Sequence, residues 1–475
     1  MSKKENPCVV ILGAGPAGLG AAYQLAQRGI KCVVLEKLDR VGGNAGSFEL
    51  AGIPVDFGSH RFHPATHPDI LAMVRRLLGE DLLTRPRHGR IRLMGRWLHF
   101  PLKASDLAVN APPRFVMGVA KDLLAKILPA KNEQTKTFSS ILKRGLGHTI
   151  CKEFYFPYAH KIWGMNPAEL SPIQAQKRVS SSSIASMLRK LLPAMPGSDK
   201  SRTQGKFYYP RNGFGQISEA LYKAALNAGA EVRLETEVSR LVLAQDEHKV
   251  EFMRGGKLHT INTQHIWSTI PITQLTRLSG TPVPEDVRNA ANSLRFRGML
   301  LIYLVLDTQQ FTPFDAHYLP GADIRITRLS EPKNYSARQR PPDTTILCAE
   351  LPCQPGDEFW AMDDKALEQL VLEDLDRAGI PVACDVRQIL VKRLPQAYPL
   401  YPVGFEKNFE LLDTWVDGLD NVLTFGRQGL YAHDNTHHAL YMACAAAKCL
   451  QANGTFDRQL WDRERAVFST HVVED

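Results

Sequence analysis

The sequence predicts an α/β fold, and three features near its N-terminus predict it. Apolar and partly β-branched residues at 9–12 predict a buried strand. The glycine turn G-x-G-x-x-G at 13–18 follows at once and opens a helix, in which apolar residues recur at three- and four-residue spacing. A second buried strand at 32–35 ends on Glu36. Together these elements predict the first βαβ unit of a parallel sheet.

Each glycine of this turn has a mechanical reason. Gly13 permits a tight turn, Gly15 lets a pyrophosphate approach the backbone, and Gly18 lets the helix pack closely on the strand. The phosphates then lie over the helix N-terminus, where unpaired N–H groups and the dipole favour an anion. Glu36 can accept a hydrogen bond from a ribose hydroxyl. The unit therefore predicts an adenine dinucleotide, and the residues predicted to contact it are Gly13, Gly15, Pro16, Ala17, Gly18 and Glu36.

The composition is that of a folded globular protein. Of the 475 residues, 44% are apolar and 23% are charged, and a chain of this length predicts about three domains. The net charge of +9 favours anionic ligands or surfaces. No run of lysine and arginine is interleaved with aromatic residues, so the sequence predicts no nucleic-acid binding.

The cysteines and the hydropathy predict a cytoplasmic protein. Eight cysteines occur without a C-x-x-C pair, several of them in apolar runs, as is typical of buried free thiols in a reducing compartment. No apolar stretch reaches the ~18 residues of a transmembrane helix, so no transmembrane segment is predicted. An amphipathic helix is expected at 115–128. It is predicted to pack as a cap helix, and contact with a membrane surface is the alternative.

The residues that follow the second strand resemble a known flavoprotein motif. Residues 36–47, E-K-L-D-R-V-G-G-N-A-G-S, are similar to the second FAD motif of the clan of amine oxidases, protoporphyrinogen oxidases, phytoene desaturases and UDP-galactopyranose mutases. The resemblance implies that the Arg-x-Gly-Gly turn lies along the diphosphate and ribityl chain of FAD, and it favours FAD over NAD. The contacts that it implies are Lys37, Arg40, Gly42, Gly43 and Asn44.

The segment at 55–63 resembles the D-x-G-x-H-x-F stretch that runs past the isoalloxazine ring in the protoporphyrinogen oxidase and mutase branches. The implied flavin contacts are Gly58, Ser59, His60 and Arg61. The resemblance also implies catalytic roles for His60 and His63, and a hydrogen-bonded turn histidine is the alternative for His63. A metal site formed by His60, His63 and His67 is a further alternative. No acidic or thiolate ligand accompanies it, so no metal is predicted.

A helical segment at 154–164 resembles the helix that covers the substrate cavity in protoporphyrinogen oxidases and mutase-like flavoproteins. The resemblance implies that Tyr158 and Trp163 stack on a planar ligand. Buried aromatic side chains usually fill a core, and this is the alternative for both.

Two arginines, Arg325 and Arg328, precede N-Y-S at 334–336. The arrangement resembles a region of the mutase branch in which an arginine lies beside the substrate diphosphate. Arg325 is the predicted catalytic-site residue, with Arg328 as the second candidate because the spacing is loose.

The C-terminal part carries a third motif of this clan. G-R-x-G-x-Y occurs within residues 421–431, and a helix rich in small residues follows. This resembles the C-terminal FAD motif of the mutase-like branch, and it implies a helix N-terminus that stabilises the anionic reduced flavin through its dipole. Helix capping is the alternative for His437 and His438, at the start of this helix. The implied contacts are Gly426, Arg427, His437, His438 and Ala439, together with Val238 near the adenine.

The resemblance covers residues 8–450 and implies the domain organisation. We expect a Rossmann-like FAD/NAD(P)-binding domain of the glutathione reductase type, interleaved with a mixed-sheet substrate domain and a helical cap. The predicted parts are a first FAD-binding part at 1–66, a first substrate and cap part at 67–205, a second FAD-binding part at 206–294, the substrate sheet at 295–400, and a C-terminal FAD-binding part with a tail at 401–475.

Two functions are compatible with the resemblance. The favoured one is an FAD-dependent oxidoreductase that takes a hydride from a C–N or C–C bond of a small organic substrate. The other is a redox-neutral isomerase like UDP-galactopyranose mutase, in which reduced flavin attacks the anomeric carbon of a nucleotide sugar. A flavoprotein without catalysis is disfavoured because it leaves the large substrate half without a role. The positive charge is compatible with an anionic substrate, and a monomer or homodimer is expected.

Overall fold

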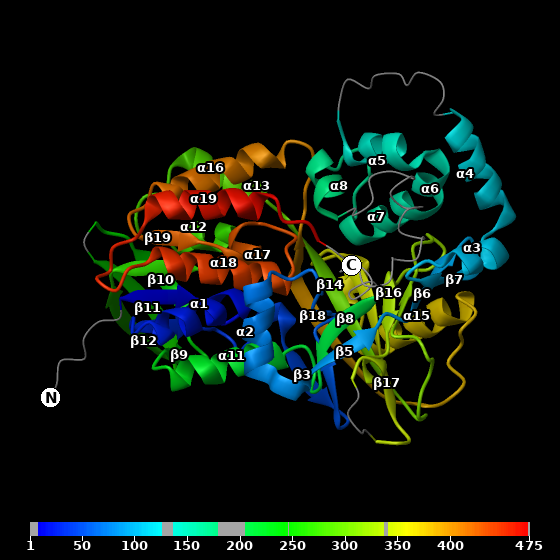
Figure 1. Ribbon diagram of the computed structural model, residues 1–475, viewed down its shortest axis with the longest axis horizontal. Helices are drawn as coiled ribbons and strands as arrows, with labels where there is room; N and C mark the ends of the chain where they lie inside the picture. Colours follow the sequence, from blue (N-terminus) through cyan, green and yellow to red (C-terminus); the bar gives the residue numbers. More distant parts are fainter. Residues whose placement is uncertain (1–7, 126–135, 179–204, 246, 337–340, 474–475) are drawn as a thin grey trace.

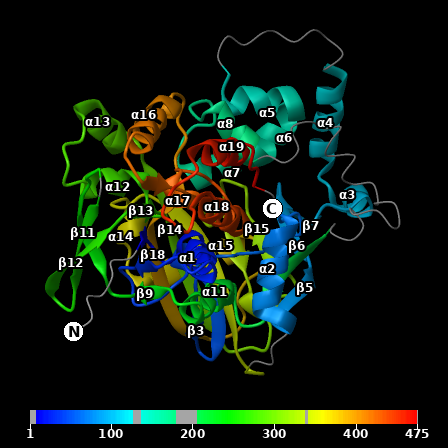
Figure 2. The same cartoon turned by 60° about the vertical axis from the view of Figure 1, so that its left-hand side comes forward.

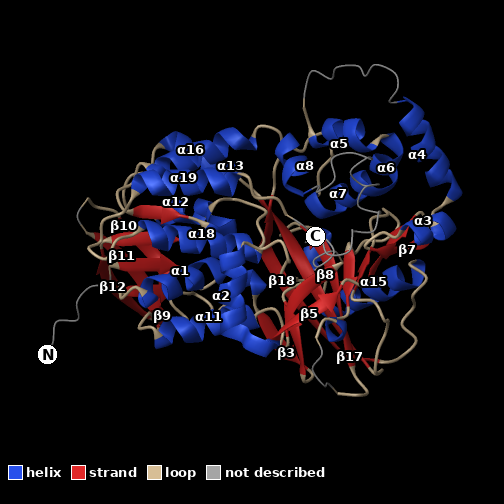
Figure 3. Ribbon diagram, viewed as in Figure 1, coloured by secondary structure: helices blue, strands red, loops and turns tan. Residues whose placement is uncertain are grey.

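A parallel sheet lies at the centre of one half of the molecule (Figure 1, Figure 3). The computed structural model describes residues 8–125, 136–178, 205–245, 247–336 and 341–473. The sheet has five strands in the order β19-β13-β1-β2-β9. Their bounds are Val422–Thr424 (β19), His265–Ser268 (β13), Val9–Leu12 (β1), Cys32–Leu35 (β2) and Glu231–Arg233 (β9).

All neighbouring strands of this sheet run parallel. The residues of β1, β2, β13 and β19 are buried, as expected for strands that are covered on both faces. The strands come from three separated stretches of the chain, within 1–66, 206–294 and 401–475. The predicted α/β fold class, with a parallel dinucleotide-binding sheet, is confirmed.

Two hydrophobic layers cover the two faces of the sheet. One layer packs on Val9, Ile11 and Val34, and the other on Val10, Leu12 and Leu35. The first contains α1 (Pro16–Gln27), α2 (Pro68–Leu78), α11 (Gln216–Asn227), α18 (Thr436–Cys449) and α19 (Arg458–Ser469). The second contains α12 (Ile272–Leu278), α13 (Glu285–Ser293), α16 (Phe405–Asp417) and an antiparallel sheet of β10 (Glu237–Val242), β11 (His248–Arg254) and β12 (Lys257–Thr263).

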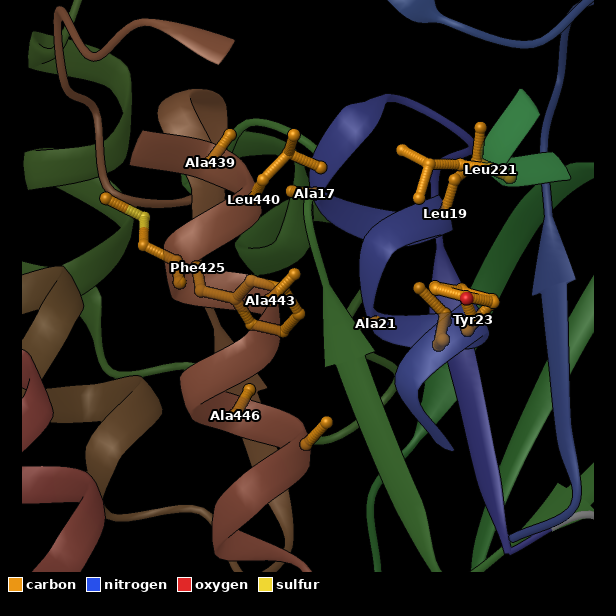
Figure 4. Close-up of a cluster of buried hydrophobic side chains, with 14 of the residues drawn as sticks. Ala17, Leu19, Ala21, Tyr23, Leu221, Phe425, Ala439, Leu440, Ala443 and Ala446 are labelled. Carbon is orange, nitrogen blue, oxygen red and sulfur yellow. The ribbon is translucent and has the colours of Figure 1, made fainter. Parts of the chain in front are cut away.

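Helices α1 and α18 approach each other through small residues (Figure 4). A Cβ atom on Gly20 would lie 3.1 Å from the Cβ of Ala443, so the glycine is needed for the close approach. Near the other end of α1, the Arg28 guanidinium donates to the carbonyl of Ala447. These contacts make the two helices parallel, and both N-termini therefore lie at the same edge of the sheet.

The other half of the molecule is built on a seven-stranded mixed sheet (Figure 1). Helix α15 (Asp364–Arg377) covers one of its faces, and the hairpin of β3 (Ser47–Leu50) and β4 (Ile53–Asp56) packs on the other. In sheet order the strands are β18 (Val386–Pro399), β14 (Phe296–Leu306), β17 (Thr345–Cys353), β16 (Arg328–Ser330), β15 (Ala316–Tyr318), β6 (Gly89–Leu93) and β7 (Arg96–Phe100). The segment that leaves β4 therefore runs between the two sheets.

A group of helices stands above this second sheet (Figure 2). The helices are α3 (Ala104–Asn110), α4 (Pro113–Ala125), α5 (Phe138–Leu146), α6 (His148–Ile150), a π-helix at Cys151–Tyr155, α7 (Phe156–Trp163) and α8 (Pro172–Arg178). A two-stranded sheet of β5 (Leu82–Pro86) and β8 (Lys206–Pro210) connects the halves. Within the described part of the chain, no helix is long and apolar enough to cross a membrane.

Candidate flavin and substrate site

The glycine turn between β1 and α1 is shaped for a ligand that approaches the backbone. A Cβ atom on Gly18 would lie 1.9 Å from the carbonyl oxygen of Gly13, so only glycine fits there. Gly13 has a φ of +97°, which is strained for other residues. A Cβ on Gly15, in contrast, would meet nothing within 4 Å. The open space above Gly15 is where a pyrophosphate approaches in such turns.

The second glycine turn lies against the first. Gly42 donates its N–H to the carbonyl of Ala14 at 2.8 Å, and a Cβ on Gly43 would lie 3.8 Å from the Cα of Gly15. The guanidinium of Arg40 donates to the carbonyl of Gly43 at 3.0 Å and lies 3.9 Å from the ring of Phe57. The two predicted FAD motifs are thus brought together at one edge of the parallel sheet.

Glu36 is buried at the end of β2, where its carboxylate accepts backbone N–H groups from the first glycine turn and from the segment that follows β2. Its Oε2 accepts the N–H of Ala14 at 2.7 Å, and its Oε1 accepts the N–H of Leu38 at 2.9 Å. Lys37, next in the chain, is exposed. Val238 is half-buried in β10, opposite Phe252. The ribose and adenine contacts of these residues stay predictions.

A buried carboxylate fixes the start of the predicted flavin segment. Asp56 Oδ1 accepts from the Ser47 hydroxyl at 2.6 Å and from the N–H of Phe214 at 2.8 Å. Its Oδ2 accepts from the Tyr209 hydroxyl at 2.6 Å. The Asp56 carbonyl accepts from the hydroxyl of Tyr303 at 2.5 Å. Because Asp56 is hydrogen-bonded to β3, β8, β14 and the turn before α11, residues 58–61 leave β4 from a fixed point.

Ser59 and Arg61 connect this segment to two tyrosines. The hydroxyls of Ser59 and Tyr335 share a hydrogen bond of 2.5 Å. Arg61 donates to Tyr335 at 3.2 Å and to Tyr318 at 3.1 Å, and it forms an ion pair with Asp315 at 3.3 Å. Burial disfavours the charge of Arg61, but the two tyrosines and Asp315 raise the pKa of its guanidinium above the ordinary value.

Arg328 and Glu350 form a buried ion pair beside Ser59. Arg328 donates through Nε and Nη2 to Glu350 at 2.7–2.9 Å. Glu350 Oε1 also accepts the N–H of Ser59 at 2.9 Å. Burial opposes the charge, but Glu350, and also Tyr318, Tyr398 and Tyr158, raise the pKa of Arg328 well above its ordinary value. The sequence reasoning missed Glu350. The sequence feature that could have indicated Glu350 is a single charged residue in the otherwise uncharged segment 345–353.

His60 turns its ring toward the backbone. Its Nε2 lies 3.0 Å from the carbonyl oxygens of Asn44 and Phe57, and its ring stacks on Phe214 at 5.1 Å. Burial lowers the pKa of His60. His63 is a turn histidine, whose Nδ1 accepts the N–H of Ala65 at 3.1 Å.

Tyr158 and Trp163 lie on α7 in different surroundings. Tyr158 packs with Tyr318 near Arg328. Trp163 is buried in the core of the helical group, and its ring meets Tyr398 edge-on at 5.5 Å. The structure therefore places Tyr158 with the tyrosine and arginine cluster, while Trp163 packs on Tyr398 in the core of the helical group.

Arg325 points toward a helix rather than toward this cluster. Its Nε donates to Asp374 at 2.9 Å, and its Nη2 donates to Glu373 at 2.9 Å, both on α15. Asp374 also accepts the N–H groups of Arg325 and Ile326 at 2.8 and 2.9 Å. These partners give Arg325 a structural position, and Arg328 is the arginine that the fold brings to Ser59.

The C-terminal motif lies beside the N-terminus of α1. A Cβ on Gly426, whose φ is +80°, would lie 2.8 Å from the Cβ of Ala17. Arg427 donates to the carbonyl of Ala397 at 2.9 Å and lies 5.1 Å from the ring of Tyr398. Helix α17 (Gly426–Gly429) and α18 follow.

At the start of α18, His438 acts as a capping residue. Its Nδ1 accepts the N–H of Asn435 at 3.2 Å. His437 is buried, with its ring 6.0 Å from that of Phe62, and Ala439 is buried against α1. Flavin contact by these residues stays a prediction.

One group of possible metal ligands exists among the described residues. Asp434, His438 and His471 place one ligand atom each within 4.8 Å of one another. Asp434 Oδ2 lies 3.3 Å from His471 Nδ1, and His438 already caps α18. These contacts anchor the C-terminal segment to α18. This group shares no residue with the histidine set at positions 60, 63 and 67, and the absence of a metal stays a prediction.

The buried histidines predict a loss of stability in acid. Burial, with neighbouring His63, His471 and Lys177, lowers the pKa of His437 to about 3 and that of His438 to about 2. Both imidazoles titrate near pH 6.5 in the unfolded chain. Between about pH 6.5 and 3 the unfolded state therefore binds protons that the folded state does not, and the free energy of unfolding falls with pH. At about pH 5 each histidine costs about 2 kcal/mol.

Urea unfolding at about pH 7.5 and 5.5 measures this effect. The variant His438→Gln retains a capping acceptor but does not titrate, so it should lose less stability between the two pH values than the unmodified protein. Equal losses in both proteins would contradict the assignment.

Comparisons with known proteins identify the family. The sequence profile described as "Flavin containing amine oxidoreductase" matches residues 16–431. The chain belongs to this family. It is thus an FAD-dependent enzyme of the oxidoreductase type, as the sequence motifs predicted, and a small-molecule substrate is consistent with the family.

The relatives within the family differ in activity. The chain is 24% identical to protoporphyrinogen oxidase 1 of Spinacia oleracea, over 90% of this chain and 80% of that protein. It is 23% identical to an L-amino acid oxidase of Cerastes cerastes, over 79% and 72%. A structure of reduced UDP-galactopyranose mutase matches 98% of this chain and 100% of that chain, with a TM-score of 0.77 and 18% identity. The last match shows a shared fold.

Proposed function

We propose that the protein is an FAD-dependent oxidoreductase that takes a hydride from a C–N or C–C bond of a small organic anion. Arg328 is the observation that carries the proposal. Glu350 orients its guanidinium through Nε and Nη2, while Nη1 makes no hydrogen bond within the described residues. An oriented guanidinium binds a carboxylate or phosphate by charge-assisted hydrogen bonds. The same Glu350 holds Ser59 of the predicted flavin segment.

The residues around the two glycine turns fit FAD, because the space above Gly15 is open and Gly43 faces it. Residues 13–18 and 42–43 would hold the diphosphate, and residues 58–61 would line the ring. When bound, FAD supplies the hydride acceptor. The protein supplies orientation, through Arg328, and exclusion of water, through the tyrosines around it.

His60 acts in this proposal as a positioning residue. It donates from Nε2 to a backbone carbonyl, and its lowered pKa keeps it neutral at pH 7. Its ring stacks on Phe214, and its hydrogen bond to the Asn44 carbonyl connects the 58–61 segment to the second glycine turn. We assign no proton transfer to His60.

A second candidate is the redox-neutral mutase reaction on a nucleotide sugar. The observation in its favour is a pair of neighbouring arginines. Arg328 lies close enough to Arg61 for its positive charge to disfavour the charged form of the Arg61 guanidinium. Two neighbouring guanidiniums suit the two phosphates of a diphosphate.

One experiment with two arms separates the candidates. In the first arm, FAD-loaded protein is mixed in air with L-amino acids and amines, and hydrogen peroxide is measured. In the second, dithionite-reduced protein is given UDP-galactopyranose and the sugars are separated. Peroxide formation without sugar isomerisation supports the oxidoreductase. A furanose product that needs the reduced protein overturns it in favour of the mutase.

A further inference from the structure

The outer side of helix α4 is an exposed apolar surface. Thirteen large hydrophobic side chains are exposed among the described residues, and five of them lie in α3 and α4. Met117 and Leu124 are 64% and 69% exposed, and Val109 of α3 is 76% exposed. The members of this surface, called here the α4 face, are Val109, Val116, Met117, Leu123 and Leu124.

The α4 face extends from the edge of the packed side of the helix round to its opposite side. Phe115 and Val119 turn inward and join the core formed by α5, α6 and α7. At 100° per residue, Met117 and Leu124 fall on the opposite side of α4, while Val116 and Leu123 flank the inward side. Packing on the cap does not account for Met117 and Leu124, because both point away from it. α4 stands at the edge of the molecule in both ribbon views (Figure 1, Figure 2).

The charges around the α4 face are positive. Lys103, Arg114 and Lys121 are exposed, and none of the three forms an ion pair with another described residue. The acidic side chains of the two helices are turned to the protein instead. Asp122 accepts the N–H of Thr149 at 2.6 Å, and Asp106 accepts the N–H of His99 at 2.8 Å.

We propose that the α4 face binds the surface of a bilayer that contains acidic lipids. Its apolar side chains would enter the boundary between headgroups and acyl chains, and Lys103, Arg114 and Lys121 would lie at the level of the phosphates. An apolar stripe with cations at its rim is the pattern of helices that lie in a membrane interface. The negative surface potential of a bilayer that contains acidic lipids attracts lysine and arginine side chains that lie near it.

Vesicle sedimentation tests the proposal with the full-length, FAD-loaded protein. We expect binding to vesicles of phosphatidylcholine with phosphatidylglycerol, and weaker binding to phosphatidylcholine alone. The double substitution Met117→Gln and Leu124→Gln should abolish binding, because it removes apolar area from an exposed helix without lowering helix propensity. The pair Arg114→Gln and Lys121→Gln should weaken binding to the acidic vesicles about fivefold per charge.

A matched control is available on the opposite side of the molecule. Met253 and Leu258 on β11 and β12 are also exposed, and replacing both by glutamine should leave vesicle binding unchanged. The proposal is overturned if the unmodified protein binds neither vesicle, or if the α4 double variant binds as well as the control. It is also overturned if the α4 substitutions only dissociate a homodimer in analytical ultracentrifugation, which would give the surface to a second copy of the chain.

Discussion

Replacing Gly15 by tryptophan is expected to yield folded protein without FAD. A Cβ atom at this position would meet nothing within 4 Å in the folded chain, so we expect the sheet and α1 to form in the variant. The indole is expected to occupy the open space beside Gly15, where the diphosphate is predicted to lie. Purified variant should therefore be colourless, with far-ultraviolet circular dichroism like that of the unmodified protein.

An exposed helical position supplies the control for this substitution. Glu219 lies on the exposed side of α11, and Glu219→Trp should retain its yellow colour and full FAD content. A yellow, fully loaded Gly15→Trp protein would show that the cofactor does not cross this turn.

Replacing Glu350 by glutamine is expected to destabilise the fold by about 3 kcal/mol. The substitution leaves the buried guanidinium of Arg328 without its carboxylate, and breaking a buried ion pair costs on this order. Both side chains are largely buried, at 16% exposure for Arg328 and 5% for Glu350. The midpoint of urea unfolding measures the loss.

The pair between Arg325 and Glu373 is the matched control because it lies at the surface. Glu373→Gln should cost at most about 1 kcal/mol, and Arg325 retains Asp374 as a partner. If both substitutions lower the free energy of unfolding by the same small amount, the Arg328–Glu350 pair does not stabilise the fold as predicted.

The parts of the fold that the sequence could predict are those set by local pattern. β1, the glycine turn and α1 are contiguous, and their apolar spacing and the steric needs of Gly13 and Gly18 are visible in the residues themselves. The second glycine turn was recognisable for the same reason. Its contact with Gly15 could be expected from the motif alone, and the structure places it there.

The choice between Arg325 and Arg328 could not be made from the sequence. Arg325 is held by Asp374, which lies on helix α15, far from Arg325 in the sequence. Arg328 is the first residue of β16, and its partner Glu350 is opposite it on β17. Cross-strand register decides which side chains meet, and register depends on tertiary pairing that spacing along the chain does not reveal.

The anchoring of the C-terminal segment was also beyond sequence reasoning. The flavin contact of His438 stays a prediction, and the structure shows that this residue also caps α18 through its bond to Asn435. Its neighbour Asp434 binds His471, a contact between a helix start and the end of the chain that no local pattern encodes.

Titration of the FAD-loaded protein with benzoate tests the central claim most directly. The claim is that Arg328 presents a cation to an anionic substrate beside the flavin. Benzoate should change the visible flavin spectrum in a saturable way, whereas neutral benzamide should not. Arg328→Lys retains a positive charge opposite Glu350 but loses the additional N–H donors of the guanidinium. Its affinity for benzoate should therefore fall about tenfold or more. Arg325→Lys should bind as the unmodified protein does. Equal benzoate affinity in Arg328→Lys, or no spectral change with benzoate at all, would contradict the account.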